Sequence, residues 1–469
     1  ESNIFIDNQK KFLSKFGIFN KKNLPSNFFV SGNFDLENLR ASFYEVSGSD
    51  DKIYDPSRSR LEKYNLLPKD LGWFPELIDK EIDFIVLGMH AKKDNPELLK
   101  AQELDCKIYS YPELIFEFSK SKTRITIGGS HGKTTVSSMI LHVLDFNNIK
   151  VDYLLGAQIE GFENMVHISD DNDFILIEGD EYLSSPIDNS PKFHKYNSNI
   201  AVITGIAWDH INVFPTFENY VEQFSIFTDS LVNGGIMVYN EADTTVKKVV
   251  ENSTNSIKKY PYSVPEHFIE NGITYLQTSE GDLPLEIFGS HNLENLAGAK
   301  WICQHMGMDE DDFYEAIASF KGASKRLEKI AENSATVIFK DFAHSPSKVA
   351  ATTNAVKKQY SDREVIACLE LHTYSSLNAE FLAEYKGALD SADKAVVFYS
   401  PHAVEIKKLA EVSAIQIGKA FEREDLIIYT NPTEFKEFLF AQNFDNTAVV
   451  LMSSGNYGGL DFDEVKGLI

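Results

Sequence analysis

The sequence has no long hydrophobic run, few cysteines and a shortage of positive charge. None of its 469 residues lies in a stretch of about 18 apolar residues, the length that a membrane-spanning helix needs. Its three cysteines, Cys106, Cys303 and Cys368, are far apart and odd in number, which argues against a disulfide framework or a zinc site and predicts buried thiols. Lysine and arginine number 45 against 70 aspartates and glutamates, a formal charge of −25. We therefore expect no nucleic-acid partner and no membrane partner.

The first thirty residues contain no apolar segment of the kind found in signal peptides, which favours a cytoplasmic location. With 43% hydrophobic and 25% charged residues, the chain has the composition of a globular protein. Its length predicts two to four domains.

Short β-branched runs alternate with amphipathic helical stretches along the chain. This pattern predicts an α/β protein whose largely parallel sheets are covered by helices on both faces and bind ligands at the carboxyl ends of their strands. Two turns, near residues 119–123 and 321–325, divide the chain into three expected domains, 1–120, 121–323 and 324–469. The expected strands are 83–88, 124–128, 173–178, 201–205, 337–341, 364–371, 394–399, 425–429 and 448–453, and the expected helices are 135–146, 219–231, 292–305, 309–319, 347–359 and 379–389.

A glycine-rich segment, residues 128–135 (Gly-Gly-Ser-His-Gly-Lys-Thr-Thr), follows an expected strand and opens an expected helix. Backbone N–H groups and the helix dipole at such a junction bind phosphate. Lys133 would reach the β- and γ-phosphates of a nucleotide, and the Thr134 hydroxyl would contact Mg²⁺. The general phosphate-loop pattern has a glycine where this chain has Ile127, so the loop is shorter. A chance Gly-Lys-Thr turn is the alternative, but the order strand, loop, helix favours a phosphate site.

Acidic and histidine side chains follow the next two expected strands. Glu178 ends one strand and would supply the hard oxygen ligand that Mg²⁺ prefers. Asp209 and His210 follow the other. Taken alone, the acidic turn after Glu178 could be a solvated surface turn, and a histidine at a strand end is more often structural than a ligand.

These segments together resemble the Mur ligase family, the peptidoglycan enzymes that add amino acids or peptides to UDP-N-acetylmuramate. The family has a short Gly-x-His-Gly-Lys-Thr-Thr loop, a Glu at the first strand end and an Asp-His pair at the second. The resemblance implies ATP and Mg²⁺ as cofactors, with Thr134, Glu178 and His210 at the metal. It also implies an N-terminal Rossmann-like domain for the UDP-sugar, a central P-loop ATPase-like domain, and a C-terminal Rossmann-like domain for the amino acid or peptide.

Three later segments extend the resemblance. Asn292 and Asn295 match the family's asparagines near adenine, although a helix N-terminus also favours asparagine. Arg326 would stabilise charge on the transferring phosphoryl group. Asp341 would meet the ribose and His344 would lie close to the γ-phosphate, while the next residue departs from the family, which often has a second histidine there. The implied catalytic residues are Lys133, Glu178, His210, Arg326 and His344, and the implied ATP contacts are Gly129, Ser130, His131, Gly132, Lys133, Thr134, Thr135, Asn292, Asn295, Arg326 and Asp341.

Two branches of the family share the histidine before Gly-Lys-Thr-Thr. One adds L-alanine, and the other, the murein peptide ligases of peptidoglycan recycling, adds the tripeptide L-alanyl-γ-D-glutamyl-meso-diaminopimelate. Tyr182 after Glu-Gly-Asp-Glu, the Lys-Phe-x-x-Tyr run 192–196, and residues 370–376 (Glu-Leu-His-Thr-Tyr-Ser-Ser) in place of the Gln-Pro-His-Arg-(Phe/Tyr) run of the alanine adders resemble the recycling branch. We favour the tripeptide as acceptor, with L-alanine as the alternative.

The N-terminal segment departs from the family. Ser49, Asp50 and His90 match its substrate-binding turns, but residues 1–43 diverge and offer only Gly32 where a glycine-rich loop should approach the UDP pyrophosphate. A catalytically lapsed Mur-like binding protein is therefore a further alternative. A folate- or cyanophycin-type ligase fits poorly, because those ligases lack the Gly-Ser-Asp segment.

Overall fold

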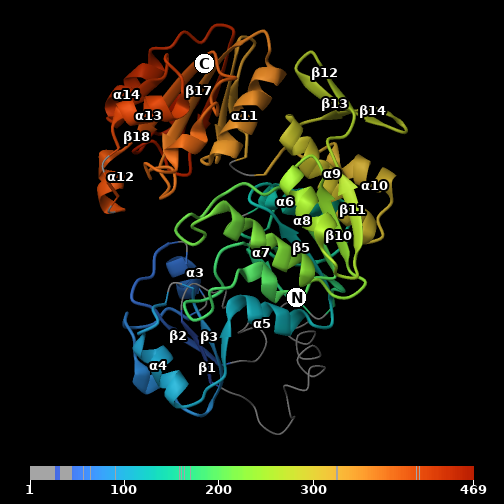
Figure 1. Cartoon of the computed structure of the whole chain (residues 1–469), viewed down its shortest axis with the longest axis vertical. Helices are drawn as coiled ribbons and strands as arrows, with labels where there is room; N and C mark the ends of the chain where they lie inside the picture. The colour runs from blue at the N-terminus through green and yellow to red at the C-terminus, as the bar shows by residue number, and fades with distance from the viewer. Residues whose placement is uncertain are drawn as a thin grey trace.

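The computed structural model describes residues 27–31 and 45–469, except residues 56, 64, 90, 158, 160, 163, 170, 324, 325, 408 and 411. Three largely parallel sheets with helices packed around them follow one another along the long axis of the molecule (Figure 1). The predicted α/β class is confirmed. No described helix is long and apolar enough to cross a membrane. The boundaries after residues 120 and 323 stay predictions.

The N-terminal sheet has the order β2-β1-β3-β4, and all its strands are parallel. One of its two inner strands, β1, was not among the expected strands. The segment where a glycine loop was expected, after β1, falls outside the described residues. The elements are β1 (Asn27–Ser31), β2 (Glu45–Ser49), α3 (Ser57–Lys63), β3 (Ile82–Leu87), α4 (Pro96–Glu103), β4 (Ile108–Ser110) and α5 (Tyr111–Ser119).

The central sheet has seven strands in the order β11-β10-β9-β5-β8-β6-β7, parallel except for β7. Because β5 lies between β8 and β9, the three segments that follow these strands meet at one edge of the sheet. The strands are β5 (Thr123–Gly128), β6 (Asp152–Leu154), β7 (Val166–His167), β8 (Phe174–Glu178), β9 (Ile200–Ile203), β10 (Ile236–Asn240) and β11 (Lys258–Tyr262).

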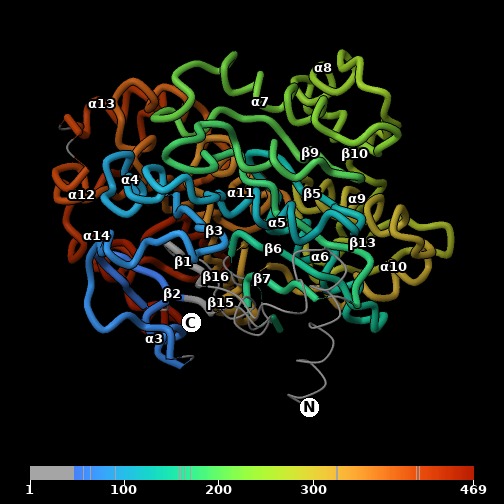
Figure 2. Tube along the Cα trace, turned by 90° about the horizontal axis from the view of Figure 1, so that it is seen from below, coloured from blue at the N-terminus to red at the C-terminus, as the bar shows by residue number. Residues whose placement is uncertain are grey.

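Helices cover both faces of the central sheet (Figure 2). One apolar core joins the sheet to α6 (Lys133–Phe146), α9 (Ser290–His305) and α10 (Glu310–Ile317). A second core, on the other face, involves α5, α7 (Phe217–Asp229) and α8 (Thr244–Asn252). Expected strands and helices in this part of the chain agree with the observed ones to within a few residues.

An antiparallel meander, which the sequence did not predict, extends from the central part toward the C-terminal part (Figure 1). It consists of β12 (His267–Glu270), β13 (Ile273–Thr278) and β14 (Gly281–Leu285). The Thr274 hydroxyl donates to Gln359 Oε1 at 3.0 Å, and Gln359 Nε2 donates to the Gly272 carbonyl at 2.7 Å. Since Gln359 ends α11 (Pro346–Gln359), the meander ties the two parts together.

The C-terminal sheet has the order β15-β16-β20-β17-β18-β19, and only β15 pairs antiparallel among its described strands. Apolar cores fill both of its faces. Cys368 lies within this sheet, where burial raises the pKa of its thiol to about 12, and Cys303 is also buried, whereas Cys106 is half-buried. The elements are β15 (Glu328–Glu332), β16 (Thr336–Asp341), β17 (Glu364–Leu371), β18 (Lys394–Tyr399), α12 (Pro401–Ile406), α13 (Ala414–Phe421), β19 (Ile427–Tyr429), α14 (Pro432–Phe440), β20 (Thr447–Met452) and α15 (Phe462–Lys466).

The helix expected over 379–389 is wrong. This segment contains only a short 3₁₀ helix, η3 (Leu382–Tyr385), flanked by turns. Its apolar residues Phe381, Leu382, Tyr385 and Leu389 have helical spacing and are buried. Gly387, however, has φ +72°, a left-handed conformation that ends a helix.

Candidate active site

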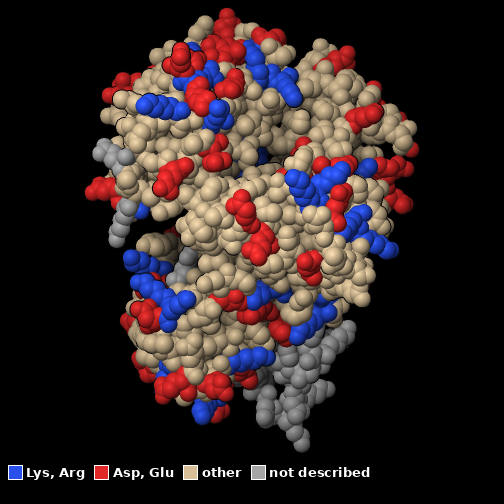
Figure 3. All heavy atoms as spheres, in the orientation of Figure 1, with Lys and Arg blue, Asp and Glu red and all other residues tan. Residues whose placement is uncertain are grey.

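A cavity of about 780 Å³ lies where the three parts of the chain meet. Many of the predicted site residues line it. From the N-terminal part these are Ser49 and Asp50, from the central part Ser130, His131, Gly132, Lys133, Thr134, Thr135, Glu178, His210, Asn292 and Asn295, and from the C-terminal part Arg326 and Asp341. Outside this lining, the face shown in Figure 3 carries Asp and Glu interspersed with Lys and Arg. Anionic ligands must therefore be attracted by local groups in the cavity.

The phosphate loop connects β5 to α6 and depends on two glycines. Gly129 and Gly132 have φ +139° and +80°, which only glycine adopts without strain. A Cβ on Gly129 would overlap the Thr204 hydroxyl, and one on Gly132 would overlap the Asn295 amide oxygen. The loop therefore lies close against its neighbours, with α6 beginning at Lys133, as a phosphate site at a helix N-terminus requires.

Lys133 is held by a carboxylate across the loop. Its ammonium donates to Glu181 Oε2 and to the Gly129 carbonyl, both at 2.5 Å. Burial alone would lower the pKa of Lys133, but the nearby carboxylates, Glu181 foremost, more than offset this effect and raise the pKa. Burial likewise opposes ionisation of Glu181, yet Lys133 and His210 hold its pKa well below the usual range. Both groups are charged.

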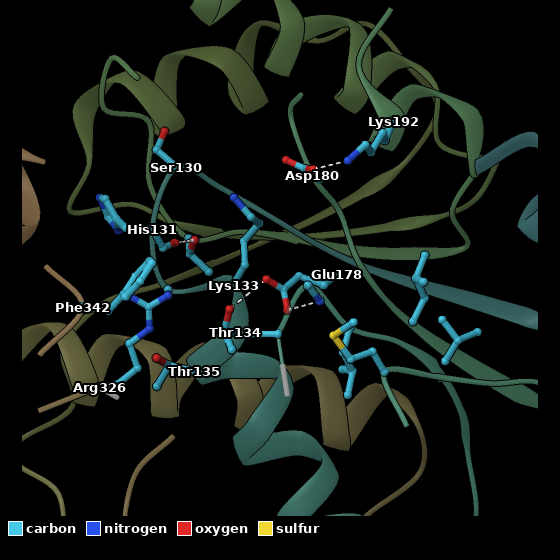
Figure 4. Close-up of a pocket in the computed structure, with 18 of the residues that line it drawn as sticks. Ser130, His131, Lys133, Thr134, Thr135, Glu178, Asp180, Lys192, Arg326 and Phe342 are labelled. Atoms are coloured by element: carbon cyan, nitrogen blue, oxygen red, sulfur yellow. Dashed lines mark hydrogen bonds and ion pairs between the residues drawn. The ribbon is translucent and has the colours of Figure 1, made fainter. Parts of the chain in front are cut away.

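Thr134 and Glu178 form the part of the site that fits magnesium (Figure 4). The Thr134 hydroxyl donates to Glu178 Oε1 at 2.8 Å, and the Gly156 N–H donates to Glu178 Oε2 at 3.1 Å. The described residues contain no cluster of three or more His, Cys, Asp or Glu groups for a metal. One or two protein oxygens suffice where nucleotide phosphates complete the coordination shell of Mg²⁺. When bound, the ion would neutralise charge on the phosphates.

His210 lies close to two carboxylates, Glu181 and Asp209. Its Nε2 lies 3.6 Å from Glu181 Oε1, and its backbone N–H donates to Asp209 Oδ1 at 2.7 Å. Burial lowers the pKa of His210, but Glu181 and Asp209 raise it by more. Glu181 thus lies between Lys133 and His210, a position that the acidic run after Glu178 could have indicated.

The start of α9 forms another wall of the cavity. Asn292 Nδ2 donates to the Phe288 carbonyl at 2.9 Å, and the Asn295 side chain lies against Gly132.

His131 packs against Gly205, where a Cβ would overlap its ring. Burial and the nearby Lys348 lower the pKa of His131 to about 4, so the imidazole is neutral at pH 7.

The C-terminal wall is built around Asp341 at the end of β16. Its Oδ2 accepts the Leu327 N–H at 2.5 Å and its Oδ1 the Ala343 N–H at 2.6 Å. These bonds fix the backbone next to Arg326, whose guanidinium lies 4.9 Å from the centre of the Phe342 ring. Asp341 therefore organises the wall, and its contact with a ribose stays a prediction.

Some predicted residues do not line the cavity. Gly129, although part of the phosphate loop, and His344 are not among the lining residues, and His344 Nδ1 lies 2.8 Å from the Phe342 carbonyl. Burial and Lys348 lower the pKa of His344 to about 4. His90 falls outside the described residues.

Three cationic residues line the cavity without having been assigned a role from the sequence. They are Arg60 on α3, Lys192 and Lys348 on α11. Lys192 pairs with Asp180 at 2.5 Å and lies 5.2 Å from the centre of the Tyr111 ring. Lys348 lies in the first turn of the helix that follows Asp341.

Family models match most of the central and C-terminal parts of the chain. A Mur ligase middle domain matches residues 127–303, and a Mur ligase, glutamate ligase domain matches residues 325–455. A UDP-N-acetylmuramate–L-alanine ligase of Caldicellulosiruptor bescii is 31% identical over 376 residues, 76% of this chain and 79% of its own. The chain belongs to the Mur ligase family. As a member, it is an ATP-dependent ligase that forms amide bonds and uses Mg²⁺.

Solved structures of Mur ligases share the fold over nearly the whole chain. A murein peptide ligase of Psychrobacter arcticus has a TM-score of 0.61 at 19% identity, covering 95% of this chain and 99% of its own. A UDP-N-acetylmuramate–alanine ligase of Thermotoga maritima has a TM-score of 0.64 at 15% identity, covering 94% and 98%. The predicted family and fold are confirmed, while the roles of individual site residues stay predictions.

Proposed function

We propose that this Mur ligase joins the lactyl carboxylate of UDP-N-acetylmuramate to the amine of L-alanyl-γ-D-glutamyl-meso-diaminopimelate. The observation that carries the choice of acceptor is the segment 370–376, which spans the end of β17 and the loop that follows it, at the carboxyl edge of the C-terminal sheet. There Glu370 is buried, accepts the Tyr457 N–H at 2.8 Å, and has its Oε1 3.6 Å from His372 Nδ1. Residues 370–376 contain neither lysine nor arginine.

This loop suits a peptide better than a free amino acid. In L-alanine the carboxylate is one carbon from the reacting amine, so an alanine site needs a cation close to the reaction centre. In the tripeptide that carboxyl group is an uncharged amide. Here Thr373 stands where the alanine branch has its arginine. The Thr373 hydroxyl accepts a hydrogen bond from the backbone N–H of Ser376 at 3.1 Å, so it forms part of a local turn. Residues 370–376 thus offer no lysine or arginine to pair with the carboxylate of free alanine.

The branch-specific residues near the metal site support the same choice. The Tyr182 ring lies 5.1 Å from the His210 ring, and its hydroxyl accepts from Asn212 Nδ2 at 3.1 Å. In the Lys-Phe-x-x-Tyr run, Phe193 and Tyr196 are fully buried in the core while Lys192 lines the cavity. The run therefore fixes one cation at the cavity wall.

The reaction would have two steps. One oxygen of the lactyl carboxylate attacks the γ-phosphorus of ATP and ADP leaves, giving an acyl phosphate. The peptide amine then attacks the acyl carbon, inorganic phosphate leaves, and the amine loses its proton. Lys133 and Arg326 would hold the phosphates, Ser49 and Asp50 would face the UDP-sugar, and the C-terminal part would exclude water from the acyl phosphate.

A second candidate is addition of L-alanine, because the 31% identical relative is a UDP-N-acetylmuramate–L-alanine ligase. The test is phosphate release from ATP with Mg²⁺ and UDP-N-acetylmuramate, measured with tripeptide, with L-alanine and with neither. We expect release stimulated by the tripeptide. Stimulation by L-alanine alone would assign the biosynthetic reaction, and no stimulation by either would contradict both candidates.

A further inference from the structure

Lys348 brings a cation from the C-terminal part into the active-site cavity. It lies in the first turn of α11, and its side chain is 19% exposed. Among the described residues, Asp209 is the one carboxylate within 4.0 Å of its ammonium, with Oδ2 at 4.0 Å. That distance is too long for a hydrogen bond. An ammonium that lines a cavity and has no carboxylate at hydrogen-bond distance is available to an anionic ligand.

The surroundings of Lys348 are richer in cations than in available anions. Burial lowers the pKa of Lys348, and Lys133 and Arg326 lower it further, against the opposing effect of Asp209 and Glu181. Of these two carboxylates, Glu181 is already bonded to Lys133, and Asp209 Oδ1 accepts the His210 N–H. Lys133, Arg326 and Lys348, from two parts of the chain, therefore line one cavity, and Asp209 Oδ2 lies 4.0 Å from the Lys348 ammonium.

We propose that Lys348 binds the γ-phosphoryl group of ATP and stays on it during its transfer. A phosphoryl group offers three oxygens and about two negative charges, enough for Lys133, Arg326 and Lys348 together. Lys133 is the phosphate-loop lysine, and such a lysine reaches the β- and γ-phosphates of a bound nucleotide. The inference rests on ATP as phosphoryl donor in the proposed function and not on which acceptor is used.

Lys348 would also couple phosphoryl binding to the approach of the C-terminal part. Asp209 belongs to the central part and Lys348 to α11, so the 4.0 Å approach bridges the two. With the γ-phosphoryl group present, Lys348 would gain oxygen acceptors and the bridge would tighten. Nucleotides without that group leave the ammonium with Asp209 alone.

The test compares nucleotides that differ only in the γ-phosphoryl group. Dissociation constants of ADP and of the non-hydrolysable analogue AMP-PNP, both with Mg²⁺, would be measured for the full chain and for Lys348→Met, Lys348→Arg and Lys358→Met. Lys358 is exposed on the same helix and serves as the matched control. For Lys348→Met we expect AMP-PNP affinity to fall about 10- to 100-fold with ADP affinity unchanged, the size of one charge-assisted hydrogen bond.

Lys348→Arg should keep most of the AMP-PNP affinity, and Lys358→Met should change neither constant. Equal losses for ADP and AMP-PNP would overturn the proposal, because a structural role would affect both nucleotides. Unchanged AMP-PNP affinity with a raised KM for the acceptor would also overturn it and assign Lys348 to an acceptor carboxylate. ADP binding reports that each variant is folded, and none of these binding measurements depends on the acceptor.

Discussion

The carboxylate of Glu181 lies between Lys133 and His210, 2.5 Å from the Lys133 ammonium and 3.6 Å from His210 Nε2. It also accepts from the Tyr220 hydroxyl at 3.2 Å, and its side chain is 2% exposed. Without nucleotide, Glu181 therefore supplies the negative charge that Lys133 needs. A bound phosphate must compete with this carboxylate for the lysine.

Replacing Glu181 by Gln should separate its role as the counter-charge of Lys133 from its competition with bound phosphate. We expect the free energy of unfolding without nucleotide to fall by about 3 kcal/mol, because the buried Lys133 loses its counter-charge. Mg-ATP should then raise the melting temperature more in Glu181→Gln than in the unmodified protein, since the phosphates no longer compete. Thermal unfolding with and without Mg-ATP measures both, with the exposed Glu218→Gln as control. An equal ATP-induced shift in both proteins would refute the competition.

The shape of the phosphate loop can be tested with one added methyl group. Gly132→Ala must adopt φ +80° and overlap the Asn295 side chain, so we expect a loss of about 1–3 kcal/mol of stability and a large loss of ATP affinity. Gly418→Ala is the matched control, because it lies within α13 with nothing within 4 Å of the added Cβ. The free energy of unfolding of Gly418→Ala should rise by about 0.5–1 kcal/mol. Chemical denaturation gives both values.

The Thr134 hydroxyl should matter for magnesium more than for folding. Thr134→Val keeps the side-chain volume but removes the oxygen beside Glu178. We expect phosphate release to fall about 100-fold at standard Mg²⁺ and to recover in part at higher Mg²⁺. Titrating Mg²⁺ in the phosphate-release assay checks this, with the exposed Thr244→Val as control. A loss of rate that no Mg²⁺ concentration relieves would place Thr134 outside the metal site.

Stability at acidic pH should depend on Glu370. Burial opposes its ionisation, but His372, Ser453 and the Tyr457 N–H more than offset this and lower the pKa of Glu370. A carboxyl group whose pKa is lowered by folding stabilises the folded state at pH values above its unfolded-state pKa of about 4.3. That stabilisation is lost as the pH falls through the folded-state pKa. Denaturation curves between pH 3 and 7 should show a steeper acid loss for the unmodified protein than for Glu370→Gln. Parallel pH profiles would contradict this.

Regular elements with strong local signals were predictable from the sequence. The strands 364–371 and 394–399 coincide with β17 and β18, because continuous apolar runs in an α/β chain form buried parallel strands. The meander was missed because β14 carries Gly281 and Pro284, residues that are rare within strands. The helix predicted over residues 379–389 was wrong, because the spacing of apolar residues does not reveal that Gly387 adopts a left-handed conformation.

Site residues that belong to a recognisable sequence motif were predictable. The phosphate loop, Glu178 and Arg326 could be found from motifs that follow expected strands and helices. The approach of Lys348 to Asp209 could not be predicted, because it depends on how the central and C-terminal parts of the chain meet. Sequence patterns show which charges are available, and the packing determines which of them converge.

The contacts of Gln359 with the meander have a geometric consequence for domain closure. They anchor the last turn of α11 to the central part, and a helix of 14 residues is about 20 Å long. A rotation of the C-terminal part that preserves this anchor must pivot near Gln359. The opposite end of α11, which carries Lys348, then travels the longest arc, so a small swing at the pivot becomes a large displacement at the phosphates.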